Sequence, residues 1–556
     1  MKKRKVAFLV FLCVVSLCAV TTQPVKSQNI GAVYILSDGT IQSSVNATVP
    51  LQQDGDVYTF TDDLVVSAFV VQRSGVTIDG AGFALEGEGQ RGIDLSFVNT
   101  VTIENVQLNG MFFYGIYISE SAYNTVTGCT ITSNGNGISV YSSAHNNVTN
   151  NIIIGNDIGI DLMEASDNIF RNNKLDNTHN IAVYGTEPSH YINDMDDSNT
   201  ISDDKKVYYF IGKENLLITP DTFPDVGFLA LVSCTNITVY DITLTKNVQG
   251  ILLVSTTGST IAQCRITDNY AGIMLFASSS NVFGENSITN NNRGIQFSMF
   301  SSGNSIFSNN IADNSGGIFL FNSSQNTIND NNITNNNYYG IGFSSSSYNL
   351  IRSNYFIGNG IHAYDASTDD PTVTASINTW HVTYPVGGNY WSDYTGVDVK
   401  SGSNQDQEGS DQIGDTPYII DANNEDNYPL MPYGSPPAVS IDSPENKTYT
   451  TTDVTLDFTV SEATSWIKYS LDGQANVTIT GGTTLSGLAD GVHSITVYAQ
   501  DTDGLTGISE TIYFTIAEGA ETPQSESFPI TWIAAIIVVV AIVGVALLYF
   551  LKIKKK

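Results

Sequence analysis

Asn281-Val-Phe-Gly-Glu-Asn286-Ser-Ile-Thr-Asn-Asn291 is a pattern that this chain repeats. The same spacing of asparagine and apolar residues returns as Asn326-Thr-Ile-Asn-Asp-Asn331-Asn-Ile-Thr-Asn-Asn336. Each copy belongs to a longer unit that begins with glycine and an apolar residue and recurs every 20 to 23 residues. The glycines are Gly250, Gly272, Gly294, Gly317, Gly340 and Gly360. A fixed period of this length, with apolar residues at alternate positions between Asn and Gly turns, predicts a solenoid whose coils consist of short strands.

The repeats arrange asparagine in three columns with apolar residues between them. A single coil cannot bury its apolar residues, but stacked coils place each residue on its copy ~4.8 Å above and below. Asparagine suits the turns because its amide can donate to the next coil and accept from the previous one, and because it tolerates left-handed backbone. We therefore predict an all-β fold, a right-handed parallel β-helix over residues 75–365 with about twelve coils. The columns are Asn281, Asn304, Asn326 and Asn349; Asn286, Asn309, Asn331 and Asn354; and Asn291, Asn314, Asn336 and Asn359.

The flanking segments lack the asparagine columns and divide the rest of the chain. Residues 28–74 contain Gly/Asp turns without a clear repeat and are predicted to cap the first coil. The break at 185–226 is predicted to leave the stack as an excursion. Residues 366–433, rich in aromatic and acidic side chains, are predicted to form the C-terminal cap. Short strand-like runs at 438–517, joined by Asp-Gly turns, predict a small Ig-like β-sandwich.

Both ends of the chain predict a protein held in the cell membrane by a single span. Residues 1–27 join a basic start to an apolar run and small residues, as secretory signals do. After a polar linker at 518–529, residues 530–551 carry no charge for 22 positions, which is long enough for a helix to cross a bilayer. The basic tail at 552–556 then predicts a cytoplasmic C-terminus, with the repeats outside the cell.

The charge balance argues against nucleic acid as a partner. The chain has 23 basic and 55 acidic residues, a net charge of −32, and nine of the basic residues lie in the first 27 or last five positions. Neutralising phosphates requires clustered Lys and Arg, which the long middle segment lacks. The composition predicts a solvated acidic surface.

Three cysteines lie beyond the predicted signal, and their register predicts what they are. Cys129 and Cys264 replace asparagine in the second column, far apart along the stack, whereas Cys234 has a different offset. This placement predicts buried free thiols instead of a disulfide framework or a thiolate metal site.

The repeats and the motifs after them resemble a known family. The Asn-x-Ile-x-x-Asn and Gly-Ile-x-Leu repeats resemble the NosD-type β-helix family, named for a periplasmic copper-related protein, and carbohydrate-binding and sugar-hydrolase β-helices. Gly388-Asn-Tyr-Trp-Ser-Asp-Tyr394 and Ile413-Gly-Asp-Thr-Pro-Tyr418 resemble the end of such domains in archaeal surface proteins, and Val439 to Ile516 is similar to the Ig-like modules that follow them. The resemblance implies a right-handed parallel β-helix, a fold that serves many functions.

Three functions are compatible with this organisation. The first is a non-catalytic surface protein whose β-helix binds a cell-surface glycan or a surface-layer protein, which the predicted secretion and anchoring favour. The second is a polysaccharide lyase or glycoside hydrolase. The third, implied by the family resemblance alone, is copper handling. Copper sites need grouped His, Met or Cys, and because the histidines are scattered we expect no copper here. They are His145, His179, His190, His362, His381 and His493.

A hydrolase needs two carboxylates about 5 to 9.5 Å apart. Asp94 and Asp161 share an outward column but lie three coils apart, ~14 Å at the coil rise. A better constellation is a column in which consecutive coils carry Tyr, His and Asp at one offset, with two further carboxylates nearby. Exposed turn residues would give the same pattern, so solvated turns are the alternative. The candidate catalytic residues are Tyr123, His145, Asp167, Asp161 and Glu164.

The acidic loop of the predicted C-terminal cap is a candidate calcium site. Residues 404–415 place acidic side chains at short intervals, with glycines that let the loop turn, and hard cations take several oxygen ligands from such loops. Gln407 and Gln412 interrupt the charge pattern, so a solvated acidic loop is the alternative. The candidate ligands are Asp406, Glu408, Asp411 and Asp415.

Seven Asn-x-Ser/Thr sequons predict N-glycosylation on exposed positions of a secreted chain. They begin at Asn46, Asn147, Asn236, Asn322, Asn332, Asn446 and Asn476.

Overall fold

The computed structural model describes residues 29–431, 437–461, 463–501 and 506–517, and the chain forms two compact units that divide after Met431. The predicted signal, polar linker, membrane helix and basic tail lie outside the described residues. Within those described ranges, no helix is both long enough and apolar enough to cross a membrane.

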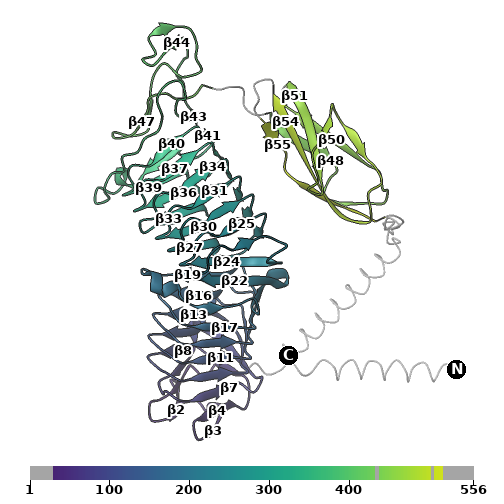
Figure 1. Ribbon diagram of the computed structural model, residues 1–556. Coiled ribbons are helices and arrows are strands. Elements are labelled where there is room, and N and C mark those ends of the chain that lie inside the picture. Colours follow the sequence, from purple (N-terminus) through teal and green to yellow (C-terminus); the bar gives the residue numbers. More distant parts are fainter. Residues whose placement is uncertain (1–28, 432–436, 462, 502–505, 518–556) are drawn as a thin grey trace, which may run out of the picture. The chain divides into compact units, whose positions relative to one another are not determined.

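The first unit is a parallel β-solenoid of about 14 turns (Figure 1). A typical turn has one six-residue strand followed by two three-residue strands, as in β30 (Ala271–Phe276), β31 (Val282–Gly284) and β32 (Ser287–Thr289). Each strand pairs in parallel with its equivalent in the next turn; for example, Ile273 of β30 lies beside Ile295. The predicted parallel β-helix is confirmed.

The six-residue strands form one sheet, which we call the long face. Their side chains alternate between the core and the outer surface, because successive residues of a strand point to opposite sides. β8 and β10 are longer and run into this sheet from the third side of the coil. The strands include β8 (Ala84–Ser96), β10 (Gln107–Ser119), β13 (Asn136–Tyr141), β16 (Ile158–Met163), β19 (His179–Tyr184), β22 (Lys205–Ile211), β24 (Val226–Val232), β27 (Gln249–Val254), β30, β33 (Arg293–Ser298), β36 (Gly316–Phe321), β39 (Tyr339–Ser344) and β42 (Ala363–Asp365).

The short strands form the other two sides of the coil. Those of the second side are β4 (Val57–Phe60), β7 (Thr77–Asp79), β9 (Thr102–Glu104), β11 (Thr125–Thr127), β14 (Asn147–Thr149), β17 (Ile169–Arg171) and β20 (Asp194–Met195), then β23 (Leu217–Ile218), β25 (Thr238–Tyr240), β28 (Thr260–Ala262), β31, β34 (Ser305–Phe307), β37 (Thr327–Asn329) and β40 (Leu350–Arg352). Those of the third side include β12 (Thr130–Thr132), β15 (Ile152–Ile154), β18 (Lys174–Asp176) and β21 (Thr200–Ile201), then β26 (Thr243–Leu244), β29 (Arg265–Thr267), β32, β35 (Asn310–Ala312), β38 (Asn332–Thr334), β41 (Tyr355–Ile357) and β43 (Tyr390–Trp391).

The asparagine columns are hydrogen-bonded ladders. Asn309 Oδ1 accepts from both the backbone N–H and Nδ2 of Asn286, at 3.0 and 2.9 Å, and Asn309 Nδ2 donates to Asn331 Oδ1 at 2.9 Å. The predicted donation to the next coil and acceptance from the previous one are confirmed. The left-handed backbone that we assigned to asparagine lies one residue earlier, at Glu285 (φ 56°) and Ser308 (φ 54°), because the turn reverses just before the ladder residue.

The predicted boundaries of the solenoid need correction. Residues 28–74 contain coils as well as a cap, since β1 (Ala32–Ile35) pairs in parallel with β6 (Ala68–Val71) and β4 with β7. The break at 185–226 stays largely within the stack, because β20 and β21 continue the sides begun by β17 and β18. The first segment lacks ladder asparagines but keeps the strand pairing, and in the second Asn193 and Asn199 extend two ladders at a longer spacing. This is why about twelve coils were too few.

The stack changes alignment at residues 180–249, where two halves of the solenoid meet. The backbone N–H of Asn180 donates to Lys246 O, and that of Val248 donates to Ile181 O. From β24 to β30, alternate side chains enter two different apolar clusters: Leu253 packs with the C-terminal core, and Leu252 packs with the N-terminal core. These strands are therefore buried on both faces.

The three ladders end on single residues of the C-terminal segment. Asn378 in the first ladder donates its backbone N–H to Asn424 Oδ1. Asn389 in the second donates to Asp426 Oδ2. Asn359 ends the third beside His362 Nδ1 at 3.3 Å. This segment closes the last coil, as the predicted cap at 366–433 should.

The three cysteines are buried and free, as predicted. Cys129 and Cys264 each stand first in a run of ladder asparagines and donate a backbone N–H to Asn151 and Asn286. Cys234 begins a fourth ladder that the sequence analysis missed, in which each backbone N–H donates to a hydroxyl of the next coil. Its first steps run from Cys234 to Thr256 and from Thr256 to Ser278.

The second unit consists of small, mostly antiparallel sheets. A three-stranded sheet contains β48 (Val439–Ser443), β50 (Val454–Val460) and β53 (Thr483–Leu485). A larger sheet contains β49 (Thr448–Tyr449), β56 (Ile512–Ile516), β54 (Gly491–Asp501), β51 (Thr464–Leu471) and β52 (Val477–Ile479), with β55 (Thr506–Ile508) at the side of β54. Leu456 and Phe514, one from each sheet, share one apolar core.

Candidate functional site

The outer surface of the long face carries a group of aromatic and paired polar side chains near Asp161, a sequence-predicted residue. Tyr117 of β10 pairs with Asp94 of β8 on one side and Ser139 of β13 on the other, and Ser139 pairs with Asp161 of β16. Asp94 and Asp161 therefore occupy one outward column with three coil steps between them, as the sequence predicted.

Aromatic rings form a row beside this column. The ring centroids of Phe113 and Tyr114 are 4.6 Å apart, and those of Tyr114 and Tyr117 are 4.8 Å apart. The guanidinium carbon of Arg91 lies 4.2 Å from the Tyr117 centroid, within the range of a cation–π contact. Phe113 is 56% exposed, so one end of the row is open to solvent.

Both carboxylates of the column are held by neighbours. Asp94 accepts from Arg91 Nη1 at 2.7 Å and from the Ser96 hydroxyl. Asp161 accepts from Asn136 Nδ2 at 2.7 Å and from Ser139 Oγ at 3.1 Å, and it is only 7% exposed. Burial raises the pKa of Asp161 above its usual range, although the two hydrogen bonds oppose the shift.

The other candidate catalytic residues lie in turns. Tyr123, His145 and Asp167 occupy equivalent positions in consecutive coils, each just before a ladder asparagine and each with left-handed backbone. The rings of Tyr123 and His145 are stacked at 5.1 Å, and Tyr123 is 61% exposed. Glu164 directly follows β16 and accepts from the Ser142 hydroxyl. The structure thus separates these turn residues from Asp161, whose carboxylate belongs to the long face.

Sequence analysis missed Arg91, Tyr114, Tyr117, Asn136 and Ser139. Their signal is positional: Tyr117 and Ser139 stand two residues after a repeat glycine, as Asp94 and Asp161 do, and Arg91, Tyr114 and Asn136 stand one residue before one. In these four coils no residue type except aspartate recurs at either offset, so a search for repeated residues passes over the missed ones.

The candidate calcium ligands are dispersed over the acidic loop. Asp411 Oδ2 accepts from Gly402 N at 3.0 Å, and Asp415 Oδ1 accepts from Lys400 N at 3.1 Å. Asp406 and Glu408 are exposed. In the described part of the chain, no three His, Cys, Asp or Glu side chains come together in a group that could hold a metal ion. To bind calcium, the carboxylates of Asp411 and Asp415 would have to leave their backbone N–H donors.

Calcium binding at this loop stays a prediction, and limited proteolysis tests it. We expect calcium to slow cleavage between Asn404 and Asp426, because a cation shared by several carboxylates would stiffen the loop. Identical cleavage with calcium and with a chelator would remove the site.

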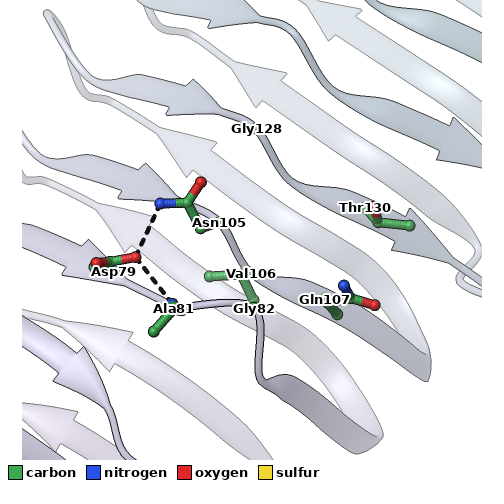
Figure 2. A pocket seen from close by; sticks show the side chains of 8 residues that line it. All are labelled: Asp79, Ala81, Gly82, Asn105, Val106, Gln107, Gly128 and Thr130. Atoms are coloured by element: carbon green, nitrogen blue, oxygen red, sulfur yellow. Dashed lines mark hydrogen bonds between the residues drawn. The ribbon is translucent and has the colours of Figure 1, made fainter.

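A polar hollow of about 460 Å³ lies at a corner of the N-terminal coils (Figure 2). Asp79 Oδ1 accepts from Asn105 Nδ2 at 3.0 Å and from Ala81 N at 2.9 Å. Gly82 and Gly128 line the hollow without side chains, which leaves it open. Its single carboxylate does not provide the pair that glycoside hydrolysis uses.

Comparisons with known proteins place the solenoid in a family. The family model described as periplasmic copper-binding protein (NosD) matches residues 68–208 and 198–396. Halomucin of Haloquadratum walsbyi is 43% identical over 99 residues, which are 16% of this chain and 1% of that protein, so the chain spans a very small part of its curated relative.

Solved structures match this chain at low similarity. The Azotobacter vinelandii mannuronan C-5 epimerase AlgE6 A-module is 13% identical, with a TM-score of 0.20, over 63% of this chain and 89% of that chain. The enzymatically active domain of bacteriophage CBA120 tailspike protein 2 is 13% identical, with a TM-score of 0.22, over 89% of this chain and 74% of that one. Because the family model covers more than half of its residues, this chain belongs to the NosD family of parallel β-helix proteins.

Proposed function

We propose that the outer surface of the long face binds an extended glycan without cleaving it. The observation that supports this most is the row of Phe113, Tyr114 and Tyr117, covered by Arg91 and flanked by hydrogen-bonded carboxylates. Aromatic rings offer flat apolar surfaces to the C–H faces of sugars, and fixed polar side chains beside them orient hydroxyl groups.

The arrangement of acids favours binding over hydrolysis. Asp94 and Asp161 are separated by three coil steps, ~14 Å at the rise of a parallel sheet. Paired glycosidase carboxylates lie about 5 to 9.5 Å apart. The phenols are also poor bases at neutral pH, because burial raises the pKa of Tyr114 and of Tyr184.

The sequence supports a place for this binding on the outside of the cell. The predicted signal and membrane helix would hold the protein at the cell membrane by one span with its solenoid outside, where the partner would be a cell-surface glycan or a surface-layer protein. The second unit then serves as an Ig-like spacer between solenoid and membrane, and N-glycans at the predicted sequons fit the same location. All seven sequon asparagines are exposed or half-exposed.

Cleavage of a polysaccharide is the second candidate. It is favoured by Asp161, a buried carboxyl with a raised pKa beside tyrosine side chains, since perturbed acids often mark catalytic sites. Release of new reducing ends or unsaturated ends from a bound polymer, lost in Asp161→Asn, would support cleavage over binding alone.

Copper does not fit the residues of this chain. The three thiols begin separate ladders, and the described residues contain no group of three metal-binding side chains. Burial also raises the pKa of the Cys129 and Cys264 thiols to about 11, which disfavours the thiolates that copper would bind. We therefore derive no step through copper.

Binding can be tested with the full-length protein and a panel of dextran, polygalacturonate and dextran sulfate. We expect Tyr117→Ala to weaken binding of the best polymer about tenfold, or ~1.4 kcal/mol, because it removes the ring on which Arg91 and Tyr114 both pack. Phe113→Ala should weaken binding as well. Because the Phe113 ring is exposed, its removal should disturb the fold less than Tyr117→Ala does. Equilibrium titration with each polymer gives the affinities.

Tyr348→Ala is the matched control, because Tyr348 is 75% exposed and lies in a turn instead of on the long face. It should leave binding unchanged. Equal affinities for wild type, Tyr117→Ala and Phe113→Ala would contradict the proposed site.

A further inference from the structure

A second aromatic cluster lies on the outer surface of the long face in the C-terminal half, around Arg293 of β33. Arg293 Nη1 donates to Gln296 Oε1 at 2.9 Å, and its guanidinium carbon lies 5.4 Å from the Phe319 ring centroid. Arg91 is paired with Asp94, but over the described ranges no carboxylate lies within 4.0 Å of Arg293. Arg293 therefore forms no ion pair with an acid of the described residues.

Two glycines make room for the rings beside this guanidinium. Gly316 lies between Arg293 and Tyr339 in one outward column, and a Cβ on Gly316 would stand 2.5 Å from Tyr339 Cζ. The Tyr339 ring therefore lies over Gly316 toward the coil of Arg293. A Cβ on Gly342 would meet both Phe319 and Tyr339, at 3.0 and 3.3 Å. The centroids of these two rings are 5.8 Å apart.

Two tyrosine side chains lie near the guanidinium, since Arg293 and Tyr270 both act on the hydroxyl of Tyr339. Arg293 N donates to Tyr270 O at 2.8 Å, which places Tyr270, the residue before β30, beside Arg293 in the neighbouring coil. The Tyr270 side chain is 41% exposed. Burial raises the pKa of Tyr339, while the charge and hydrogen bonding of Arg293 oppose this shift. A half-buried cation beside phenol donors and without an acid is suited to receive an anionic group.

The cluster lies across the junction of the two halves from the proposed glycan site. Ala182 pairs with Asp161, and Gln249 and Ala271 precede Arg293 in its own column; all three are buried, and Val183 N donates to Gln249 Oε1 across the junction. The charges of Asp161 and Arg293 both act on the hydroxyl of Tyr184. One extended polymer could therefore contact both clusters.

We propose that Arg293, with the hydroxyls of Tyr270 and Tyr339, binds a carboxylate or sulfate group of an acidic polysaccharide. This inference rests on the proposed glycan binding and adds the class of glycan. The net negative charge of the chain supports a localised site, because a polyanion is repelled by most of an acidic surface and must bind where cations gather.

The test compares the same three polymers with the full-length protein and variants of two arginines. Wild type should bind polygalacturonate, dextran sulfate or both more tightly than dextran. Arg293→Gln should weaken binding of the preferred acidic polymer about tenfold and leave dextran unchanged, and Arg293→Lys should recover part of the loss. Arg265→Gln is the matched control, since Arg265 is exposed on the third side of the coil.

Each result decides between the two proposals. A loss confined to polygalacturonate assigns a carboxylate, and a loss confined to dextran sulfate assigns a sulfate. Equal losses in Arg293→Gln and Arg265→Gln would mean a general charge effect and overturn the inference. Equal binding of dextran and both acidic polymers, still sensitive to Tyr117→Ala, would overturn the inference and leave the proposed function. Failure to bind all three polymers would overturn both.

Discussion

Asp426→Ala is expected to open the C-terminal end of the solenoid. Asp426 has 0% exposure and terminates the second ladder: its Oδ2 accepts from Asn389 N at 2.7 Å and Trp391 Nε1 at 3.0 Å, and its Oδ1 accepts from Tyr428 N at 3.1 Å. Alanine would leave three buried donors without an acceptor, at about 1 to 3 kcal/mol each. Allowing for relief of the buried charge, we expect a loss of about 3 kcal/mol and roughly 100-fold faster hydrogen exchange at the Asn389 amide.

Asp426→Asn is the matched variant, because an asparagine oxygen can accept from Asn389 and Trp391 as it does elsewhere in the ladder. It should lose only the bond from Tyr428. Exchange at Asn389 that is as slow in Asp426→Ala as in wild type would contradict the role of Asp426 as the ladder terminus.

The same carboxyl should make the cap sensitive to pH. Burial raises the pKa of Asp426 from 3.8 to about 6, so the folded cap holds its proton more tightly than the unfolded chain does. The stabilisation is therefore complete below pH ~4 and is lost as pH rises to about 6, by about 3 kcal/mol. The difference in cap stability between wild type and Asp426→Asn, measured by exchange at Asn389 from pH 4 to 7, should change over this interval and be flat above it.

Asn309→Ala should have a similarly large effect in the middle of the stack. Its Oδ1 accepts two hydrogen bonds from Asn286, and its Nδ2 donates to Phe283 O and Asn331 Oδ1 at 2.9 Å. Alanine would remove the acceptor of the Asn286 backbone N–H, one of the two acceptors of Asn286 Nδ2 and a donor to the Phe283 carbonyl, all in the core. We expect a loss of about 3 to 5 kcal/mol, measured as faster hydrogen exchange at the Asn286 amide.

Asn310→Ala controls for the change of side chain. Asn310 is the next residue, is exposed, and accepts only from Asn332 Nδ2 at 3.1 Å. Its removal should cost about 0.5 kcal/mol or less, since exposed polar contacts contribute little. Comparable acceleration in both variants would show that the ladder is not the main stabilising element of the turn.

The solenoid could be predicted from the sequence where the same residue type makes the same hydrogen bonds in every coil. Asn286, Asn309 and Asn331 recur because each must accept from the coil before and donate to the coil after. The first coils escaped notice because β1, β4 and their partners are joined by Gly/Asp turns without ladder asparagines. The junction of the two halves could not be predicted from the repeats either, because it depends on tertiary contacts. One of them joins Tyr191 and Phe276, whose ring centroids are 5.1 Å apart.

The candidate site was predictable only in part, for the same reason. Asp161 and Asp94 could be assigned to one outward column by counting from the repeat glycines. Their partners could not, because Arg91 contacts Tyr117 of the next coil and the partner positions repeat no residue type. The turn column of Tyr123, His145 and Asp167 attracted attention because it is regular, yet its regularity follows from left-handed turns that precede each ladder asparagine.

Hydroxyl-radical footprinting of the full-length protein, with and without the tightest-binding polymer, tests most directly whether the long face is the binding surface. We predict that bound polymer protects Phe113, Tyr117 and Tyr270, while Tyr348 and Phe300, which are exposed in turns, are modified at unchanged rates. Protection of Tyr123 and His145 with no change on the long face would contradict the account.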